Sequence, residues 1–162
     1  YEKVVKEKLE VDNQPAGAGV AVVEETAIVK SGQVLAEKEA IVAETFIENL
    51  EFGFDSADLT AADKTELDGL IVKIDQYRPM LRANVAHLNV IGHTDSQGAE
   101  SYNQGLSERR AQAVADYFAT VGSVPTQTMQ VSGKGEADPI GDNNTDEGRS
   151  LNRRVVIEVI KH

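Results

Sequence analysis

The chain has 162 residues, enough for one domain with a hydrophobic core and an appendage. Its 27 acidic and 16 basic residues give a formal net charge of -11, which argues against a nucleic-acid binder and against adsorption to an anionic lipid surface. Cysteine is absent, so a disulfide framework and a thiolate metal site are both excluded.

The sequence starts at Tyr1 without a charged-then-apolar signal segment. It contains no apolar stretch close to the roughly 20 residues that a helix needs to span a bilayer. We therefore expect a fragment or mature piece of a longer protein. Any membrane attachment would belong to a part of the parent protein that this sequence does not contain.

Residues 1–45 are predicted to be an N-terminal extension or linker that is ordered only in part. A charged run over residues 2–11 precedes residues 12–19, whose Gly, Pro and Asn content is typical of turns and linkers. Short apolar patches follow between residues 20 and 42, without a clean helical or alternating period. Either a hairpin or a tether that becomes ordered against a partner fits this pattern, and both stay open.

A regular pattern begins at residue 45. Alternation over residues 45–54 predicts a half-buried strand with Phe46, Leu50, Phe52 and Phe54 on one face. Thr60 and Asp63 resemble a capping box at the start of a helix. The apolar stripe of that helix comprises Leu67, Leu70, Ile71 and Ile74. Pro79 is expected to end or bend it.

The second half of the chain predicts a further helix and three strands. In order, the pattern gives a strand over 86–92, a helix from about 101 to 121 stopped by Gly122, a short strand at 129–131, a loop over 133–144 and a closing strand at 155–160. The order strand, helix, strand, helix, strand, strand predicts an α/β sandwich of two helices on one sheet. Its two strand–helix–strand units favour some parallel pairing.

The stretch from residue 91 to 111 carries the candidate binding site. A polar loop with Asp95 follows a strand, and the next helix carries Arg109 and Arg110, in a position where ligands commonly bind. A carboxylate and a guanidinium converging there would suit a zwitterionic amino acid. The residues alone also allow an Asx turn at Asp95 and a solvated helix face for Arg110. Adjacent helix residues point about 100° apart, so the two arginines cannot share one role.

A metal site and an enzyme are the competing interpretations of the same region. Metal-binding side chains are offered by His87, His93, Asp95 and Glu100. A transition-metal site, however, needs three or four convergent ligands that are themselves held in place by hydrogen bonds. The chain also lacks a nucleophile elbow, an HExxH motif and an evident acid/base pair in an apolar pocket. We therefore predict no metal, no other cofactor and no catalytic activity.

Several motifs together resemble the peptidoglycan-binding domain of OmpA-like proteins over about residues 46–161. The central motif comprises Gly92, His93, Thr94, Asp95, Gly98, Asn103, Leu106, Ser107, Arg110 and Ala111. Upstream, the resemblance rests on Phe52, Gly53, Phe54, Asp55, Ser56 and Leu59, and downstream on residues 133–136, Pro139, Asn143 and residues 148–155. The run from Tyr102 to Ala111 is most similar to the porin-type members.

This resemblance implies a βαβαββ sandwich, with two main helices on a mixed four-stranded sheet formed by residues 46–162. It implies that Asp95 binds the ammonium group of diaminopimelate in the peptidoglycan stem peptide and that Arg110 binds its carboxylate, leaving Arg109 to solvent. The other implied binding residues are Thr94, Asn103, Asp55 and Ser56, with Gly98, Leu106, Asn152 and Arg154 in support. The implied location is the periplasmic domain of an outer-membrane protein.

Two further questions stay open at the level of sequence. Arg149, Asn152, Arg153 and Arg154 form a basic cluster that suggests phosphate or nucleic acid in isolation, whereas the resemblance favours a structural role, with Arg153 or Arg154 in reach of glycan. The alternative function is a protein-interaction or dimerisation module of an envelope or flagellar stator complex. Residues 1–45 would then dock a neighbour or form a homodimer.

Overall fold

The computed structural model describes residues 3–5 and 40–162. Residues 44–160 form one compact unit. Outside that unit, β1 (Lys3–Val5) pairs antiparallel with residues 40–42 at the start of β2 (Ala40–Glu48). Residues 43–45 of the predicted extension also belong to β2, so the regular structure begins earlier than predicted. The remaining residues of the extension, including the apolar patches before residue 40 that suggested a hairpin or a tether, lie outside the described residues.

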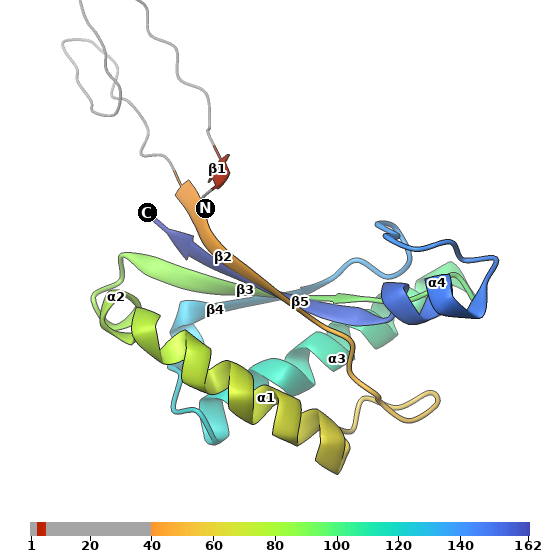
Figure 1. Cartoon of the computed structure of the whole chain (residues 1–162), viewed down its shortest axis with the longest axis horizontal. Helices are drawn as coiled ribbons and strands as arrows, with labels where there is room; N and C mark the ends of the chain where they lie inside the picture. Colours follow the sequence, from red (N-terminus) through yellow and green to blue (C-terminus); the bar gives the residue numbers. More distant parts are fainter. Residues whose placement is uncertain (1–2, 6–39) are drawn as a thin grey trace, which may run out of the picture. The chain divides into compact units, whose positions relative to one another are not determined.

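Four strands and two long helices build the unit of residues 44–160 (Figure 1). The strands follow the order β2-β5-β3-β4, where β3 is Ala86–His93, β4 is Met129–Gly133 and β5 is Arg154–Lys161. Strands β3 and β4 run parallel. Helices α1 (Ala61–Ile74) and α3 (Glu100–Thr120) lie on the same side of the sheet. The predicted α/β sandwich with a mixed four-stranded sheet is confirmed.

The core lies between this sheet and the two helices. Its buried apolar side chains include Phe46, Leu50, Leu67, Leu70, Ile74, Leu88, Val90, Val114, Phe118, Ile157 and Val159. Helix α1 begins with the predicted capping box, in which the Thr60 side chain accepts from the Asp63 N–H and the Asp63 carboxylate accepts from the Thr60 N–H. No helix in the described part of the chain is long and apolar enough to cross a membrane.

A pair of glycines sets how closely α3 approaches the sheet. Gly92 and Gly133 are register partners on β3 and β4, and both lie directly beneath Ser107 of α3. A Cβ atom added to Gly92 would be 2.1 Å from the Ser107 carbonyl oxygen, and one added to Gly133 would be 2.3 Å from Ser107 Oγ. The same Oγ accepts a hydrogen bond of 2.9 Å from the Gly135 N–H. Helix α3 therefore rests on the strand backbone itself.

The strand predicted at residues 45–54 is wrong in its bounds. β2 ends at Glu48, and the phenylalanine at position 54 is fully exposed. Beyond Glu48 the polar groups pair outside the sheet: the Asn49 side chain donates to carbonyls at residues 150, 151 and 153, and the Glu51 N–H donates to the Asp63 carboxylate. The aromatic alternation thus continues past the point where the chain leaves the sheet.

Two short helices also differ from the sequence-based expectations. α1 ends at Ile74, and the 3-10 helix η1 (Asp75–Tyr77) separates it from α2 (Arg78–Arg82). Pro79 lies in the first turn of α2, where its missing N–H costs no helical hydrogen bond, so it starts a helix rather than ending one. α4 (Asp146–Asn152), capped by the Thr145 side chain, was not predicted, because its seven residues contain only one large apolar side chain, Leu151.

Candidate functional site

Asp95 lies just beyond the end of β3 and is 7% exposed. Its Oδ1 accepts a hydrogen bond of 3.0 Å from the Gln97 N–H, which is the Asx turn that the residues alone allowed. Its Oδ2 accepts a hydrogen bond of 2.7 Å from Arg153 Nη1 and forms an ion pair with it. The Asx turn uses only Oδ1, so Oδ2 can pair with a positively charged group, which in the free domain is Arg153.

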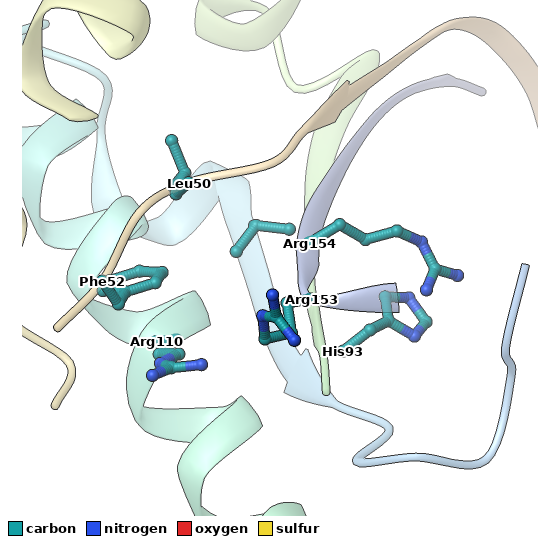
Figure 2. Close-up of a pocket in the computed structure, with 7 residues that line it drawn as sticks. Leu50, Phe52, His93, Arg110, Arg153 and Arg154 are labelled. Carbon is teal, nitrogen blue, oxygen red and sulfur yellow. The ribbon is translucent and has the colours of Figure 1, made fainter. Parts of the chain in front are cut away.

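Arg110 lies on the buried stripe of α3 and is 8% exposed. Its Nε donates to the Ser56 carbonyl at 2.8 Å and its Nη2 to the Gly53 carbonyl at 3.2 Å. The Phe52 ring covers one face of the guanidinium, with 4.8 Å between Cζ and the ring centroid (Figure 2). Its neighbour Arg109 is exposed, as the family resemblance implied.

The charge of Arg110 has little compensation. Burial, and then the positive charge of Arg153, lower the pKa of the Arg110 guanidinium, while the Asp95 carboxylate opposes this. Within the described residues, Arg110 hydrogen-bonds to carbonyl groups and forms no ion pair with a carboxylate. A buried guanidinium held in this way is well placed to receive an anionic group of a ligand.

Thr94 and Asn103 shape the loop that carries Asp95. Thr94 Oγ1 donates to the Asp95 carbonyl at 2.8 Å, and Asn103 Nδ2 donates to the Gln97 carbonyl at 2.8 Å and to Glu136 Oε1 at 3.0 Å. Both side chains are buried. Gly98 has a φ of 94°, in the left-handed region that glycine tolerates best, and lets the loop turn over Asn103.

Asp55 and Ser56 lie beside Arg110 rather than beside Asp95. Ser56 contributes its backbone carbonyl to Arg110, and its hydroxyl accepts from the Asp58 N–H at 2.9 Å. Asp55 is exposed and has a φ of 55°. The segment therefore forms the wall next to the guanidinium, with the Asp55 carboxylate on the solvent side.

Three predicted supporting residues hold the walls of the site. Leu106 is buried in α3, next to the polar part of the helix stripe. Asn152 is fully buried and bonds to residues 140, 141 and 143 through both ends of its amide. Arg154 is 6% exposed and donates to the carbonyls of Asn152 and Asp138. Asn152 and Arg154 of the basic cluster thus hold the loop of residues 138–143 in place. Arg153 of the same cluster pairs with Asp95.

A small pocket lies between these elements (Figure 2). Its lining residues are Leu50, Phe52, His93, Arg110, Arg153, Arg154 and Val155. His93 Nδ1 and Arg154 Nε are buried there without a hydrogen-bond partner in the described part of the chain. The pocket is strongly cationic, which suits an anion. Among the described residues, no group of three or more His, Cys, Asp and Glu side chains is arranged to hold a metal ion.

The sequence model of the OmpA family matches residues 51–153. The chain belongs to the OmpA family. Domains of this family bind or anchor to peptidoglycan and are not enzymes. The family assignment confirms the resemblance found in the sequence, and it covers the loop of Asp95, helix α3 with Arg110 and the cluster up to Arg153.

Individual relatives place the OmpA-family domain in the envelope. The outer-membrane lipoprotein YfiB of Pseudomonas aeruginosa is 40% identical over 114 residues, which cover 69% of this chain and 67% of that protein. The outer membrane protein A of Bordetella avium is 38% identical over 127 residues, which cover 78% and 59%. The chain thus spans about two thirds or less of these relatives. The predicted location in the periplasm, as part of an outer-membrane protein, is confirmed.

Solved structures agree on the fold. The crystal structure of the peptidoglycan-associated lipoprotein from Burkholderia pseudomallei superposes with a TM-score of 0.57 and 20% sequence identity, covering 70% of this chain and 88% of that one. At this identity the likeness concerns the fold alone.

Sequence reasoning missed three features of this OmpA-family site. It did not pair Asp95 with Arg153, place the Phe52 ring on Arg110, or assign Asn49 to the end of α4. Only the contact between Phe52 and Arg110 could have been found in the sequence. Position 110 belongs to the buried stripe of α3, and a buried guanidinium needs an aromatic ring or carbonyl groups against it. The other two contacts join segments far apart in the chain.

His93 is expected to make the stability of the domain depend on pH. Burial, and then the charge of Arg154, lower the pKa of His93 from 6.5 to about 4. Between these values the unfolded chain binds a proton that the folded domain does not, so the free energy of unfolding falls as the pH drops from about 6.5 to about 4. We expect this loss to be roughly 1–2 kcal/mol, because the pocket is partly open to solvent.

Urea unfolding at several pH values measures this effect. His93→Gln is expected to flatten the pH dependence between pH 7 and pH 4, because glutamine does not titrate in this range. Equal slopes for wild type and His93→Gln would contradict the assignment to His93.

Proposed function

We propose that this OmpA-family domain binds peptidoglycan non-covalently through the diaminopimelate residue of the stem peptide, and so anchors an outer-membrane or envelope protein to the cell wall. The proposal rests on a pair of buried opposite charges, Asp95 after β3 and Arg110 on α3, which lie beside one cationic pocket. Family membership supports the binding of peptidoglycan. The charge pair supports the choice of diaminopimelate.

In the proposed complex, Asp95 binds the ligand ammonium group and Arg110 binds the carboxylate on the same stereocentre. Both contacts are charge-assisted hydrogen bonds, which are stronger than neutral ones. Backbone N–H groups at the start of α3 add donors. Thr94 and Asn103 hold the loop of Asp95, while Asp55 and Ser56 form the wall beside Arg110.

The charge pair accounts for selectivity between types of cell wall. A lysine-type stem presents the ammonium group without the neighbouring carboxylate. Arg110 would then lose water to the ligand without gaining an anionic partner, which costs binding free energy. A diaminopimelate-type stem satisfies both charges at once.

Single-site affinity is expected to be modest, because the proposed complex rests on two charge-assisted contacts, each of which contributes about 1.5–3 kcal/mol. Peptidoglycan is a continuous polymer, so many anchored copies bind the same sheet of wall. Their combined avidity then exceeds the affinity of one site.

Pull-down on purified diaminopimelate-type sacculi tests the proposal. Asp95→Asn and Arg110→Gln are each expected to weaken binding by roughly 10- to 100-fold, which corresponds to the 1.5–3 kcal/mol of a charge-assisted contact. Lysine-type sacculi should retain little of the wild-type protein. Circular dichroism checks that each variant is folded, since Arg110 also contacts Gly53 and Ser56.

Two matched variants serve as controls. Arg109→Gln and Glu100→Gln remove one charge each from exposed positions on the same helix, and both should bind sacculi as the wild type does. Arg110→Lys keeps the charge without the planar fork and should fall between wild type and Arg110→Gln. Unchanged binding by folded Asp95→Asn and Arg110→Gln would refute the charge-pair mechanism.

The protein-interaction alternative stays a prediction of the sequence. It assigns docking or formation of a homodimer to residues 1–45, most of which lie outside the described residues.

A further inference from the structure

We infer that Arg153 is a built-in counter-ion of Asp95 that the ligand ammonium group displaces, and that the freed guanidinium then binds the ligand carboxylate together with Arg110. Arg153 would thereby be a specificity-determining residue. The inference rests on the proposed function, because it concerns how the same site selects its ligand.

The ion pair between Arg153 and Asp95 occupies the oxygen that the proposed ammonium contact needs. Nη1 of Arg153 lies 2.7 Å from Asp95 Oδ2. The Asp95 side chain is 10% exposed, whereas that of Arg153 is 44% exposed. A ligand can therefore move the guanidinium toward solvent, but the carboxylate stays where it is. The mobile partner of the pair is the arginine.

The backbone of Arg153 is fixed, so only its side chain can respond. Its N–H donates to the Arg149 carbonyl at 3.1 Å, and its own carbonyl accepts from Asn49 Nδ2 at 3.1 Å. Within the described part of the chain, Asp95 is the sole hydrogen-bond partner of the guanidinium. Loss of that one contact releases the side chain without disturbing α4 or β5.

The charges around the pocket favour an exchange of ion-pair partners over simple removal of Arg153 from Asp95. Before binding, the Asp95 carboxylate lies close to two positive groups, Arg110 and Arg153, and these two guanidinium groups repel each other. A zwitterionic ligand brings an ammonium group for Asp95 and a carboxylate for the arginines. Both arginines line the same pocket (Figure 2), so one carboxylate can serve them both.

A ligand with an ammonium group alone cannot complete this exchange. It would displace Arg153 from Asp95 and leave two neighbouring guanidinium groups without an anion. Arg153 thus adds to the penalty against lysine-type stems that Arg110 already imposes. Removing its charge should lower that penalty, so lysine-type ligands should bind more tightly to the variant than to the wild type.

Titration calorimetry with two soluble muropeptides of equal length, one containing diaminopimelate and one containing lysine, tests this inference. For Arg153→Gln we expect the ratio of the two dissociation constants to shrink by about 10-fold, with the lysine peptide binding more tightly than it binds wild type. Arg153→Lys keeps the charge and should retain most of the selectivity. Arg109→Gln removes an equal charge from an exposed site and should leave the ratio unchanged.

The outcomes separate the two proposals. If wild type does not prefer the diaminopimelate peptide, the proposed function itself fails. If wild type has this preference and folded Arg153→Gln keeps the same ratio, or loses both peptides equally, Arg153 has only a structural role and the inference is overturned.

Discussion

Replacing Gly92 with alanine is expected to destabilise the domain by about 3 kcal/mol. The added Cβ would clash with the backbone of Ser107, which cannot move aside as a flexible side chain can. The new Cβ would lie 2.1 Å from the carbonyl oxygen and 2.9 Å from the carbonyl carbon of Ser107. Helix α3 would have to lift from β3, which also moves Arg110 relative to Asp95. We therefore expect loss of binding to sacculi even at temperatures where the variant remains folded.

Gly69→Ala is the matched control for this prediction. Gly69 lies at an exposed position inside α1, and an added Cβ meets no heavy atom within 4 Å. Alanine there should stabilise the domain by about 0.5–1 kcal/mol, as expected for a glycine in a helix interior. Urea unfolding of both variants measures the contrast. A loss below 1 kcal/mol for Gly92→Ala would show that α3 is not seated on the strand as described.

Asn152→Ala is the second substitution with a large expected effect, a loss of about 2–4 kcal/mol. The amide is fully buried, and its Oδ1 accepts from the N–H groups of Ile140 and Gly141, both at 2.7 Å. Its Nδ2 donates to the Gly141 carbonyl and to Asn143 Oδ1. Alanine leaves all four partners without the amide, and the loop they belong to loses its attachment to α4.

Asn144→Ala provides the comparison, because Asn144 is an exposed residue of the same loop. It should change the free energy of unfolding by less than 0.5 kcal/mol, as is usual for surface substitutions. Hydrogen exchange at the amides of Ile140 and Gly141 gives a local readout. Exchange at these amides should rise in Asn152→Ala and stay slow in Asn144→Ala. Unaltered protection in Asn152→Ala would contradict the assigned contacts.

Features with a local cause were predictable from the sequence. The capping box needs only Thr60 and Asp63, three residues apart, and it forms as predicted. Helical spacing predicted that Arg109 and Arg110 point in different directions, and the family resemblance selected Arg110. In the structure Arg110 continues the buried stripe of Val114 and Phe118.

Features that depend on tertiary contacts were not predictable. Asp95 and Arg153 are 58 positions apart, and nothing in either segment indicates that they meet. The side chain of Asn49 reaches carbonyls at the end of α4 about a hundred residues away, which ends β2 earlier than its aromatic alternation suggests. A short helix such as α4 has too few apolar side chains to show a period.

The seating of α3 on Gly92 and Gly133 has an entropic consequence for binding. The helix that carries Arg110 and the strand that leads to Asp95 touch through backbone, so their relative position is already fixed in the free domain. A ligand that bridges the two charges does not have to order them. Preorganisation of this kind lowers the entropic cost of association, and most of the cost that remains lies in the ligand and in the side chain of Arg153.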